Sequence, residues 1–328
     1  MKASIWEMNN SKGDFMYYIG IDLGGTNIAV GIVTEDGMIV KKTSVPTGAH
    51  RPFEEIFQDM ADCIRKLLAE TGISESELKS IGIGTPGCLD TKQGMLIFAG
   101  NFKYGKLVNY RELMQKHFNL PVYICNDANA AALAEAKVGA AKGVDNVMMV
   151  ALGTGVGGGI IIDGKIYEGH LTAAGELGHI VIVHDGEYCT CGRNGCWEAY
   201  ASVTALIRQT KEAMAKYPDS IMNETPMDKV NGRTSFDAAK KGDKAALEVV
   251  AKYQEYIADG LANLVNVLCP EIIVVGGGIC KEGDYLLGPV NEMMQKRVFG
   301  AGLLPERKMV VAQLGNDAGL IGAALLHA

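Results

Sequence analysis

The sequence predicts an α/β protein of two domains, and three observations support this prediction. The chain has 328 residues, which is more than one small hydrophobic core usually organises. Hydrophobic residues make up 48% of it and 41 residues are glycine, a composition typical of globular α/β proteins. Two segments, 18–41 and 147–170, repeat a pattern of strand, Gly-rich turn, strand, Asp-Gly turn and strand. We therefore expect two similar β-meanders, each opening one half of the molecule.

The segments that follow each meander alternate between helical and strand patterns. An apolar stripe over residues 53–68 predicts a helix, and strands are expected at 79–84 and 121–125. In the second half, residues 245–268 predict a long helix, and residues 317–326 predict a helix that closes the fold. Hydrophobic patterning therefore favours α/β domains with a cleft between them.

The domain boundaries follow from this order of elements. We expect a small α/β domain over residues 16–128 plus 315–328 and a large α/β domain over residues 129–314. Residues 1–15 are polar and are expected to form a short loose extension. They lack the apolar run of a signal peptide or membrane anchor, so a cytoplasmic protein without membrane contact is expected.

Charge and cysteine content exclude some classes of function. The formal net charge is -7, without the clustered Lys and Arg that neutralise a nucleic-acid backbone, so we expect no nucleic-acid partner. The chain has eight cysteines, and in a reducing compartment these serve as core residues, metal ligands or reactive groups more often than as disulfides. Five in apolar or Gly-rich settings are interpreted as packing residues: Cys63, Cys88, Cys125, Cys269 and Cys280.

Glycine turns directly after strands predict an anion-binding site. The turn in Asp22-Leu-Gly-Gly-Thr-Asn27 and the turn in 153–159 let backbone N–H groups approach phosphate oxygens closely. Either turn alone is equally consistent with a tight hairpin, and neither matches a P-loop or a dinucleotide fingerprint. A third glycine run, 276–278, is a candidate wall for the base or ribose. The candidate nucleotide-binding residues are Asp22, Gly24, Gly25, Thr26, Asn27, Gly153, Thr154, Gly155, Gly157, Gly277 and Gly278.

Asp127 is the candidate catalytic carboxylate. It lies where an expected strand ends and a strongly helical segment begins, so capping of that helix is one interpretation. The other is that it accepts the proton of a substrate hydroxyl as the hydroxyl oxygen attacks phosphorus. Asp22 beside the first turn is the candidate for orienting Mg²⁺ or its waters, since Mg²⁺ is commonly held by few protein carboxylates.

The segment 188–198 carries three thiols, Cys189, Cys191 and Cys196, on a tight Gly-containing loop. Three soft ligands and one imidazole, from His179 or His184, would close a tetrahedral Zn²⁺ site with no open position, so the expected role of zinc is structural. A reversible disulfide pair is the alternative.

Zinc binding would also orient a ligand-binding group. If one ring nitrogen of His179 binds zinc, the other is a fixed hydrogen-bond partner for a hydroxyl-rich ligand. Glu176 and Glu198 flank it as acceptors for adjacent sugar hydroxyls.

Taken together, these residues resemble the ROK family of bacterial sugar kinases and regulators. The resemblance extends from about Met16 to the end of the chain. It rests on the motifs DLGGTN at 22–27, NDANAAALAE at 126–135, GTGVGGG at 153–159, GELGH at 175–179 and CTCGRNGCWE at 189–198. Within the family, the overall pattern, including GCWEAYAS, is most similar to the glucokinases.

The resemblance implies a fold, an activity and a set of site residues. The implied fold is the two-domain actin-like ATPase (hexokinase or ribonuclease H-like) fold, with the last helix returning to the first domain and with dimeric or tetrameric assembly. The implied activity is ATP-dependent phosphorylation of a hexose at its 6-hydroxyl, glucose favoured, with Asp127 as base. Implied sugar contacts are Asn101, Asn126, Asp127, Glu176, His179 and Glu198, and implied zinc ligands are His179, Cys189, Cys191 and Cys196.

Three alternatives remain beside this interpretation. The acceptor could be mannose, fructose, N-acetylglucosamine or N-acetylmannosamine, which differ from glucose in groups whose pocket walls no motif places. At the far rim of the sugar, Asn101-Phe-Lys-Tyr-Gly departs from the Asn-Leu-Gly-Trp type sequence usual in the family. A sugar-responsive repressor is disfavoured, because about fifteen residues before the first strand are too few for a helix-turn-helix domain. A non-catalytic sugar-binding module would tolerate loss of Asp127 or of the glycine turns, and this sequence keeps both.

Overall fold

The protein is described by a computed structural model that covers residues 16–327. The described chain forms two compact units. The first unit runs to Val138 and also includes His170–Thr172 and the C-terminal segment from Asn316. The second comprises Gly139–Gly169 and Ala173–Gly315. The domain boundaries expected from the sequence stay a prediction. The compact units differ from them in assigning residues 129–138 to the first unit, and the expected extension over 1–15 lies outside the described residues.

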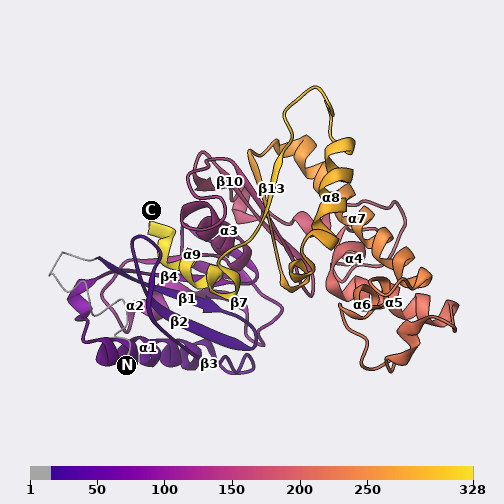
Figure 1. Ribbon diagram of the computed structural model, residues 1–328. Helices are drawn as coiled ribbons and strands as arrows, with labels where there is room; N and C mark the ends of the chain where they lie inside the picture. The colour runs from indigo at the N-terminus through magenta and orange to yellow at the C-terminus, as the bar shows by residue number, and fades with distance from the viewer. Residues whose placement is uncertain (1–15, 328) are drawn as a thin grey trace, which may run out of the picture. The chain divides into compact units, whose positions relative to one another are not determined.

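The first unit contains eight strands and four α-helices among the residues described (Figure 1). Its strands are β1 (Tyr17–Leu23), β2 (Asn27–Thr34), β3 (Ile39–Pro46), β4 (Leu78–Thr85), β5 (Cys88–Asp90), β6 (Met95–Phe98), β7 (Lys106–Asn109) and β8 (Val122–Asn126). Its helices are α1 (Phe53–Thr71), α2 (Tyr110–Gln115), α3 (Asp127–Lys137) and α9 (Ala318–Ala324), with short 3-10 helices at Glu75–Glu77, His170–Thr172 and Leu325–His327.

The main sheet of the first unit has the strand order β3-β2-β1-β4-β8. The first three strands pair antiparallel, as a meander does, whereas β4 and β8 are added in parallel to β1. Strands β5, β6 and β7 form a separate antiparallel sheet. The carboxyl ends of β1, β4 and β8 therefore lie at the same edge, the edge where α/β proteins bind ligands.

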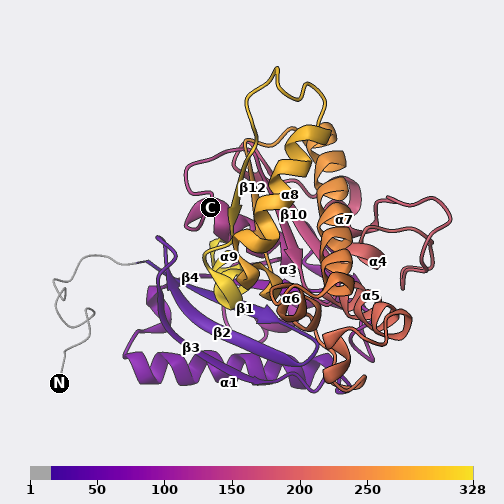
Figure 2. The same cartoon turned by 45° about the vertical axis from the view of Figure 1, so that its right-hand side comes forward.

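Helices cover both faces of the main sheet in the first unit. Helix α1 buries the apolar stripe predicted from the sequence, including Ile56, Phe57 and Met60, and it lies along the opposite face of the sheet from α9 (Figure 2). Helix α9 approaches the sheet very closely, because a Cβ on Gly20 of β1 would lie 2.1 Å from the Leu320 carbonyl oxygen. A Cβ on Gly82 of β4 would lie 1.7 Å from the Ala323 carbonyl oxygen. These two glycines allow the last helix to pack on the first unit, as the resemblance implied.

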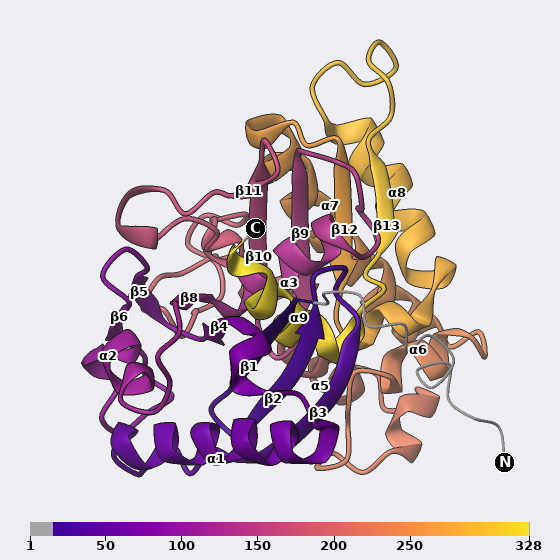
Figure 3. The same ribbon diagram turned by 90° about the vertical axis from the view of Figure 1, so that its left-hand side faces the viewer.

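The second unit contains five strands and five α-helices among the residues described (Figure 3). Its strands are β9 (Val147–Leu152), β10 (Val156–Ile162), β11 (Lys165–Ile166), β12 (Ile272–Gly276) and β13 (Lys308–Val311). Its helices are α4 (Glu198–Ala201), α5 (Val203–Lys216), α6 (Thr234–Ala239), α7 (Lys244–Leu268) and α8 (Asp284–Arg297). Short 3-10 helices lie at Leu177–His179, Ile221–Glu224 and Gly278–Glu282. A further 3-10 helix, Gly315–Asp317, leads into α9.

The sheet of the second unit repeats that of the first. Its order is β11-β10-β9-β12-β13, again an antiparallel meander followed by two parallel strands. Helices α7 and α8 pack against each other beside this sheet, and their apolar side chains belong to the same core as β9 and β12. The duplicated pattern read from the sequence is thus confirmed. In the second meander, Asp163 and Gly164 both have positive φ, as the turn type predicted for an Asp-Gly pair requires.

Two predictions about cysteines are wrong. Cys63, Cys125 and Cys280 are buried as expected, but Cys88 and Cys269 are exposed. Cys88 begins a strand of the small, partly exposed sheet, and Cys269 takes positive φ just past the end of α7, so neither reaches the core. No helix within residues 16–327 is long and apolar enough to span a membrane.

Candidate functional site

Three parallel strands of the first unit end beside one another and position the polar residues predicted there. Asp22 of β1 is opposite Gly84 of β4, and Thr85 of β4 is opposite Asn126 of β8. Asp127 follows Asn126 directly as the first residue of α3. The first glycine turn, the candidate base and the candidate magnesium-orienting carboxylate therefore lie at the same sheet edge.

The cap of α3 is Asn126 and not Asp127. The Asn126 side chain accepts hydrogen bonds from the backbone N–H groups of Ala128 at 2.9 Å and Asn129 at 3.3 Å. The capping interpretation of Asp127 is therefore wrong, because the residue before it satisfies the helix terminus. Asp127 Oδ1 accepts one bond, from Ala128 N at 2.8 Å, which leaves most of the acceptor capacity of the carboxylate for a ligand.

The two carboxyl groups at this edge are poorly solvated. Burial raises the pKa of Asp127, although the N–H of Ala128 opposes the rise. Burial and, to a lesser extent, the charge of Asp127 raise the pKa of Asp22 to about 6. The Asp22 carboxyl also packs closely against α9, since a Cβ on Gly319 would lie 2.9 Å from its Oδ2. Like charges in a desolvated place favour a proton or a cation, and a hard cation such as Mg²⁺ prefers oxygen ligands of this kind.

The first glycine turn is held by residues beyond the motif. Gly24 N donates to Asn27 O at 3.0 Å and closes the turn. The fully buried Thr47 donates through Oγ1 to Gly24 O at 2.6 Å and through its backbone N–H to Thr26 O at 2.9 Å. Thr26 and Asn27 are exposed and can offer side-chain donors to an anion.

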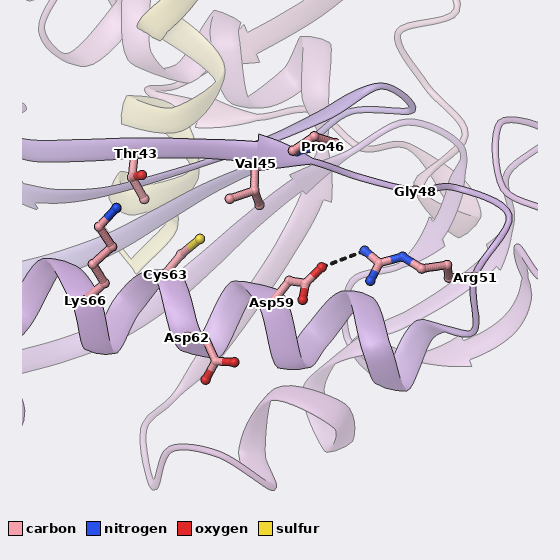
Figure 4. A pocket seen from close by; sticks show the side chains of 9 residues that line it. All are labelled: Thr43, Val45, Pro46, Gly48, Arg51, Asp59, Asp62, Cys63 and Lys66. Carbon is pink, nitrogen blue, oxygen red and sulfur yellow. Dashed lines mark hydrogen bonds and ion pairs between the residues drawn. The ribbon is translucent and has the colours of Figure 1, made fainter.

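Behind Thr47 lies a hollow between β3 and α1, shown in Figure 4. Its wall includes Arg51, which donates to the Thr47 carbonyl oxygen at 2.9 Å and to Asp59 Oδ2 of α1 at 2.6 Å. None of the site residues predicted from the sequence lines this hollow. The Arg51–Asp59 pair thus supports the first turn through Thr47.

Asn101 lies next to the first turn. It is exposed, on the loop between β6 and β7, and a Cβ on Gly25 would lie 3.4 Å from Asn101 Cβ. The structure therefore brings Asn101 together with the turn, as expected of residues that serve one site.

The second glycine turn, Gly153–Val156, joins β9 to β10 in the second unit and ends on the first residue of β10. Gly153 O accepts from Val203 N at 2.8 Å, and Thr154 O accepts from Thr204 Oγ1 at 2.7 Å. Glu198 Oε2 accepts from Val156 N at 2.9 Å. Gly157 lies within β10, opposite Ala151, so its expected place in the turn is wrong and its backbone belongs to the sheet.

The third glycine run follows β12, the parallel neighbour of β9. Gly276 is opposite Ala151, and Gly277 has φ 105°. A Cβ on Gly277 would lie 2.0 Å from the Leu152 carbonyl oxygen, so only glycine fits there. Gly277 and Gly278 therefore lie beside the start of the second turn.

Four side chains of the second unit form a candidate metal centre. The ligand atoms of His179, Cys189, Cys191 and Cys196 all lie within 4.8 Å of one another. Cys191 Sγ is 3.6 Å from Cys196 Sγ, and Cys189 Sγ is 3.6 Å from His179 Nδ1. Sulfur ligands of tetrahedral zinc lie about 3.8 Å apart, whereas a disulfide needs about 2.05 Å. The donor set and the spacing fit zinc.

The two histidines considered as the fourth ligand differ in position. The His184 side chain is 91% exposed and Nδ1 lies 3.0 Å from Asp185 Oδ2, whereas His179 faces the cysteines. The Nε2 atom of His179 is 4.0 Å from Glu176 Oε2. His179 thus has one ring nitrogen toward the sulfurs and the other toward a carboxylate, as a histidine that serves both a metal and a hydroxyl-rich ligand requires.

Glu198 is the first residue of α4 and lies close to the metal centre. Its Oε1 is 3.7 Å from Cys189 Sγ. It follows Trp197, which is fully buried and donates from Nε1 to Tyr256 O at 2.7 Å. The segment 176–198 thus gathers the predicted sugar-binding residues Glu176, His179 and Glu198 in one unit.

Three of the residues that hold the turns are not apparent from the sequence. Thr47, Val203 and Thr204 follow no motif, and their bonds join positions far apart in the chain. For Thr204 a weak signal exists, because Ser202 is a cap residue before an amphipathic segment and places the start of a helix there.

Known proteins match the chain over nearly its whole length. A model of the ROK family matches residues 18–328. The chain is 38% identical over 312 residues to a protein named glucokinase from Streptomyces coelicolor, covering 93% of this chain and 96% of the relative. It is 35% identical over 308 residues to a glucokinase from Thermotoga maritima, covering 93% and 95%. A xylose repressor from Caldicellulosiruptor bescii is 31% identical over 305 residues, covering 93% of this chain and 76% of the relative.

Solved structures of similar sequence share the fold. A ROK family glucokinase from Streptomyces griseus, in complex with glucose and AMPPNP, is 35% identical with a TM-score of 0.75, covering 94% of this chain and 98% of that one. A ROK hexokinase from Thermus thermophilus is 32% identical with a TM-score of 0.80, covering 95% and 97%. The chain therefore belongs to the ROK family and has its two-domain actin-like ATPase fold.

Proposed function

We propose that this protein transfers the γ-phosphoryl group of ATP to a hexose, with glucose the favoured acceptor and glucose 6-phosphate the product. The observation that carries the proposal is the position of Asp127. Its carboxylate is not the cap of α3, is partly desolvated and lies beside the first glycine turn at the carboxyl edge of the sheet. Glucokinases are among the similar proteins, and one similar structure holds glucose and AMPPNP.

In the proposed reaction, Asp127 is the general base. Its carboxylate accepts the proton of the 6-hydroxyl as the hydroxyl oxygen forms a bond to the γ-phosphorus. The bond from that phosphorus to the bridging oxygen breaks, and ADP leaves with the electron pair. The raised pKa of Asp127 makes it a better proton acceptor than an ordinary aspartate.

We propose that six residues orient the sugar through hydrogen bonds. These are Asn101, Asn126, Asp127, Glu176, His179 and Glu198. The Asn126 side-chain oxygen is used in capping, so its Nδ2 is the group offered to the sugar. Ionised acceptors such as Glu176 make the stronger bonds to hydroxyl groups.

The phosphates are assigned to the two glycine turns. Backbone N–H groups of Gly24 to Asn27 and of Gly153 to Gly155 are the proposed donors, with the glycines at 277 and 278 beside the nucleoside. The desolvated carboxyl of Asp22 is the proposed Mg²⁺-orienting group. A bound Mg²⁺ would offset the charge that develops on the transferred phosphoryl group.

For the metal centre we propose a structural zinc. His179, Cys189, Cys191 and Cys196 would occupy all four positions and leave none for water or substrate. The role of these residues is to hold the segment 176–198 in the shape that presents Glu176, His179 and Glu198.

We also propose that the protein forms a homodimer or homotetramer. The segment after α8 exposes Phe299 at 86% and Leu303 at 89%, and Val267 near it is 79% exposed. Phe299 N donates to Asn266 Oδ1, which joins this segment to the end of α7. Apolar side chains exposed together are typical of contact surfaces.

Sedimentation of the wild-type protein and of Leu303→Asp tests this proposal. The variant should dissociate, and an unchanged oligomer would contradict the assignment of this surface as the contact between subunits.

Another hexose or N-acetylhexosamine is the second candidate acceptor. The sequence around Asn101 departs from the usual family pattern, and Asn101 contacts the first turn. A sugar-responsive regulator is a third candidate, favoured only by relatives named xylose repressor, of which this chain covers about three quarters.

A coupled ADP-release assay tests the proposal. ATP and Mg²⁺ are supplied with a panel of hexoses and N-acetylhexosamines, and ADP release without sugar is the background. We expect the highest kcat/KM with glucose. Release that no sugar raises above background would contradict a hexose kinase, and a clear preference for an N-acetylated sugar would replace glucose as the acceptor.

A further inference from the structure

One carboxylate in the second unit, that of Glu198, is placed to serve both sugar binding and the second glycine turn. Glu198 is expected to bind the sugar, yet its Oε2 already accepts a hydrogen bond at 2.9 Å from Val156 N, the last residue of the second glycine turn. A carboxylate has about four acceptor positions, so this bond leaves Glu198 able to bind a sugar hydroxyl as well.

The turn is built around this carboxylate. A Cβ on Gly155 would lie 2.3 Å from Glu198 Oε2, so the glycine leaves the space that the carboxylate fills. Gly155 does not have positive φ, so the contact with Glu198 is what excludes a side chain there. Glycine at this position is therefore required by the neighbour and not by the backbone conformation.

Glu198 itself has little freedom to move. Trp197, the residue before it, donates from its backbone to Ile180 O at 2.8 Å and from Nε1 to Tyr256 O at 2.7 Å. The Trp197 ring lies against α7, where a Cβ on Gly260 would be 2.0 Å from ring atom Cε2. Cys196, two residues before Glu198, is a candidate zinc ligand. A rigid segment on one side of the turn thus presents the carboxylate to it.

We propose that Glu198 is a positioning residue for the second glycine turn, so that one side chain sets the affinity for the nucleotide as well as for the sugar. This inference rests on the proposed function, because the turn matters only if it binds phosphates. The turn N–H groups must point at the phosphate oxygens, and the bond from Val156 N to Glu198 fixes their direction. The carboxylate does not itself contact the nucleotide, since its negative charge would repel phosphate.

Two substitutions of Glu198 separate this role from sugar binding. Glu198→Gln keeps an oxygen that can accept from Val156 N, whereas Glu198→Ala removes it. Calorimetric titration with ADP and Mg²⁺ in the absence of sugar, and with glucose in the absence of nucleotide, reads the two affinities separately. We expect ADP affinity to fall roughly tenfold in Glu198→Ala and to stay within about threefold of wild type in Glu198→Gln, while glucose affinity falls in both. Equal ADP affinity in wild type and Glu198→Ala would overturn the proposal.

A second pair of variants tests the geometry independently of how Glu198→Ala folds. Gly155→Ala should displace the carboxylate and lower ADP affinity roughly tenfold, whereas Gly288→Ala in α8, where a Cβ meets nothing within 4 Å, should leave it unchanged. The double variant Gly155→Ala/Glu198→Ala should bind ADP no more weakly than Glu198→Ala alone, because both changes remove the same contact. If the losses of ADP affinity in the two single variants multiply in the double variant, the proposed contact between Gly155 and Glu198 is contradicted.

These titrations, taken with the ADP-release assay, distinguish failure of this inference from failure of the proposed function. A wild-type protein that phosphorylates no hexose but binds ADP through Glu198 would contradict the function and leave the positioning role standing. If the wild-type protein phosphorylates a hexose but its ADP affinity is the same with and without the Glu198 carboxylate, the function stands and the positioning role is contradicted.

Discussion

The two glycine turns follow the same strand pattern but are held in different ways. The first turn, Asp22–Asn27, is held by the hydroxyl and backbone of the buried Thr47, with the Arg51–Asp59 pair behind it. The second turn, Gly153–Val156, is held by the carboxylate of Glu198 and by Val203 and Thr204 at the start of α5.

The repeated meander therefore specifies the turn and not the residues that support it. The supports come from segments outside the two meanders. They are the residue after β3 and α1 in one unit, and the segment 198–204 in the other. Glu198 connects the second turn to the candidate metal centre, because it accepts from Val156 N and lies 3.7 Å from Cys189 Sγ. The two turns should therefore respond differently to loss of metal and to small changes in their supports.

The largest effect is expected beside the first turn, at Asp127. Asp127→Asn keeps the shape of the side chain but removes the proton acceptor, so kcat should fall at least a thousandfold, with glucose Kd changed by less than about threefold. Steady-state kinetics and glucose titration measure the two quantities. Asp163→Asn, in the exposed Asp-Gly turn of the second meander, is the matched control and should keep wild-type kcat. Turnover near wild type in Asp127→Asn would refute the assignment of the base.

Removal of the metal should affect the second turn and leave the first turn unchanged. In Cys191→Ser we expect loss of zinc and a loss of glucose affinity of about tenfold or more, because the ligand segment no longer holds His179 and Glu198. Hydrogen exchange should become faster in peptides that contain Gly153–Val156 and stay unchanged in those that contain Gly24–Asn27. The exposed Cys269, far from the cluster in sequence, provides the control Cys269→Ser. A zinc-free protein with full sugar affinity would contradict the proposed connection between zinc binding and sugar binding.

A smaller effect is expected when one hydrogen bond is removed from each turn. Thr47→Val and Thr204→Val delete the bonds to Gly24 O and Thr154 O, and each should raise KM for ATP by roughly three- to tenfold. The effect of Thr47→Val should be the larger, because Thr47 is fully buried and Gly24 O then has no replacement donor, whereas Thr204 is exposed to water. Thr47→Ser should restore most of the loss. Equal increases in KM for ATP in Thr47→Val and Thr204→Val would contradict the expectation that burial strengthens the effect of losing the bond.

The smallest expected effect concerns stability. The pKa of Asp22 is raised to about 6, so the folded state binds this proton more tightly than the unfolded state does. Native stability is therefore reduced as pH rises from about 4 to about 6, and the reduction is complete above that range. Asp22→Asn should raise the free energy of unfolding by about 1 kcal/mol at pH 7.5 and by far less near pH 4. Urea unfolding at both pH values measures this, and a gain that is the same at both would contradict the shift.

Local patterns predicted much of the fold. The apolar stripe of α1, the duplicated meander and the strand before α3 each leave a periodic signal within a short window, so residues such as Ile56 and Asp163 could be placed in advance. The four zinc ligands also lie close in sequence, which made the cluster visible, although the choice between His179 and His184 had to come from the structure.

Other features depend on contacts that no short window contains. Asn126 and Asp127 are both good cap residues, and only the backbone decides which one caps α3. The place of Gly157 in β10 follows from its pairing with Ala151, and the role of Thr47 follows from bonds to a turn more than twenty residues earlier. Cys88 and Cys269 have apolar neighbours in sequence but lie where the chain reaches the surface.

The proposed reaction is tested most sharply by comparing glucose with 6-deoxyglucose as acceptors for the wild-type protein. Both sugars keep the hydroxyls assigned to Glu176, His179 and Glu198, but only glucose has the oxygen that Asp127 is proposed to deprotonate. We predict that both sugars bind with similar affinity, that glucose releases ADP and gives a phosphate monoester on its 6-oxygen by ³¹P NMR, and that 6-deoxyglucose releases no ADP above background. Phosphorylation of 6-deoxyglucose at a rate close to that of glucose would contradict the proposed reaction.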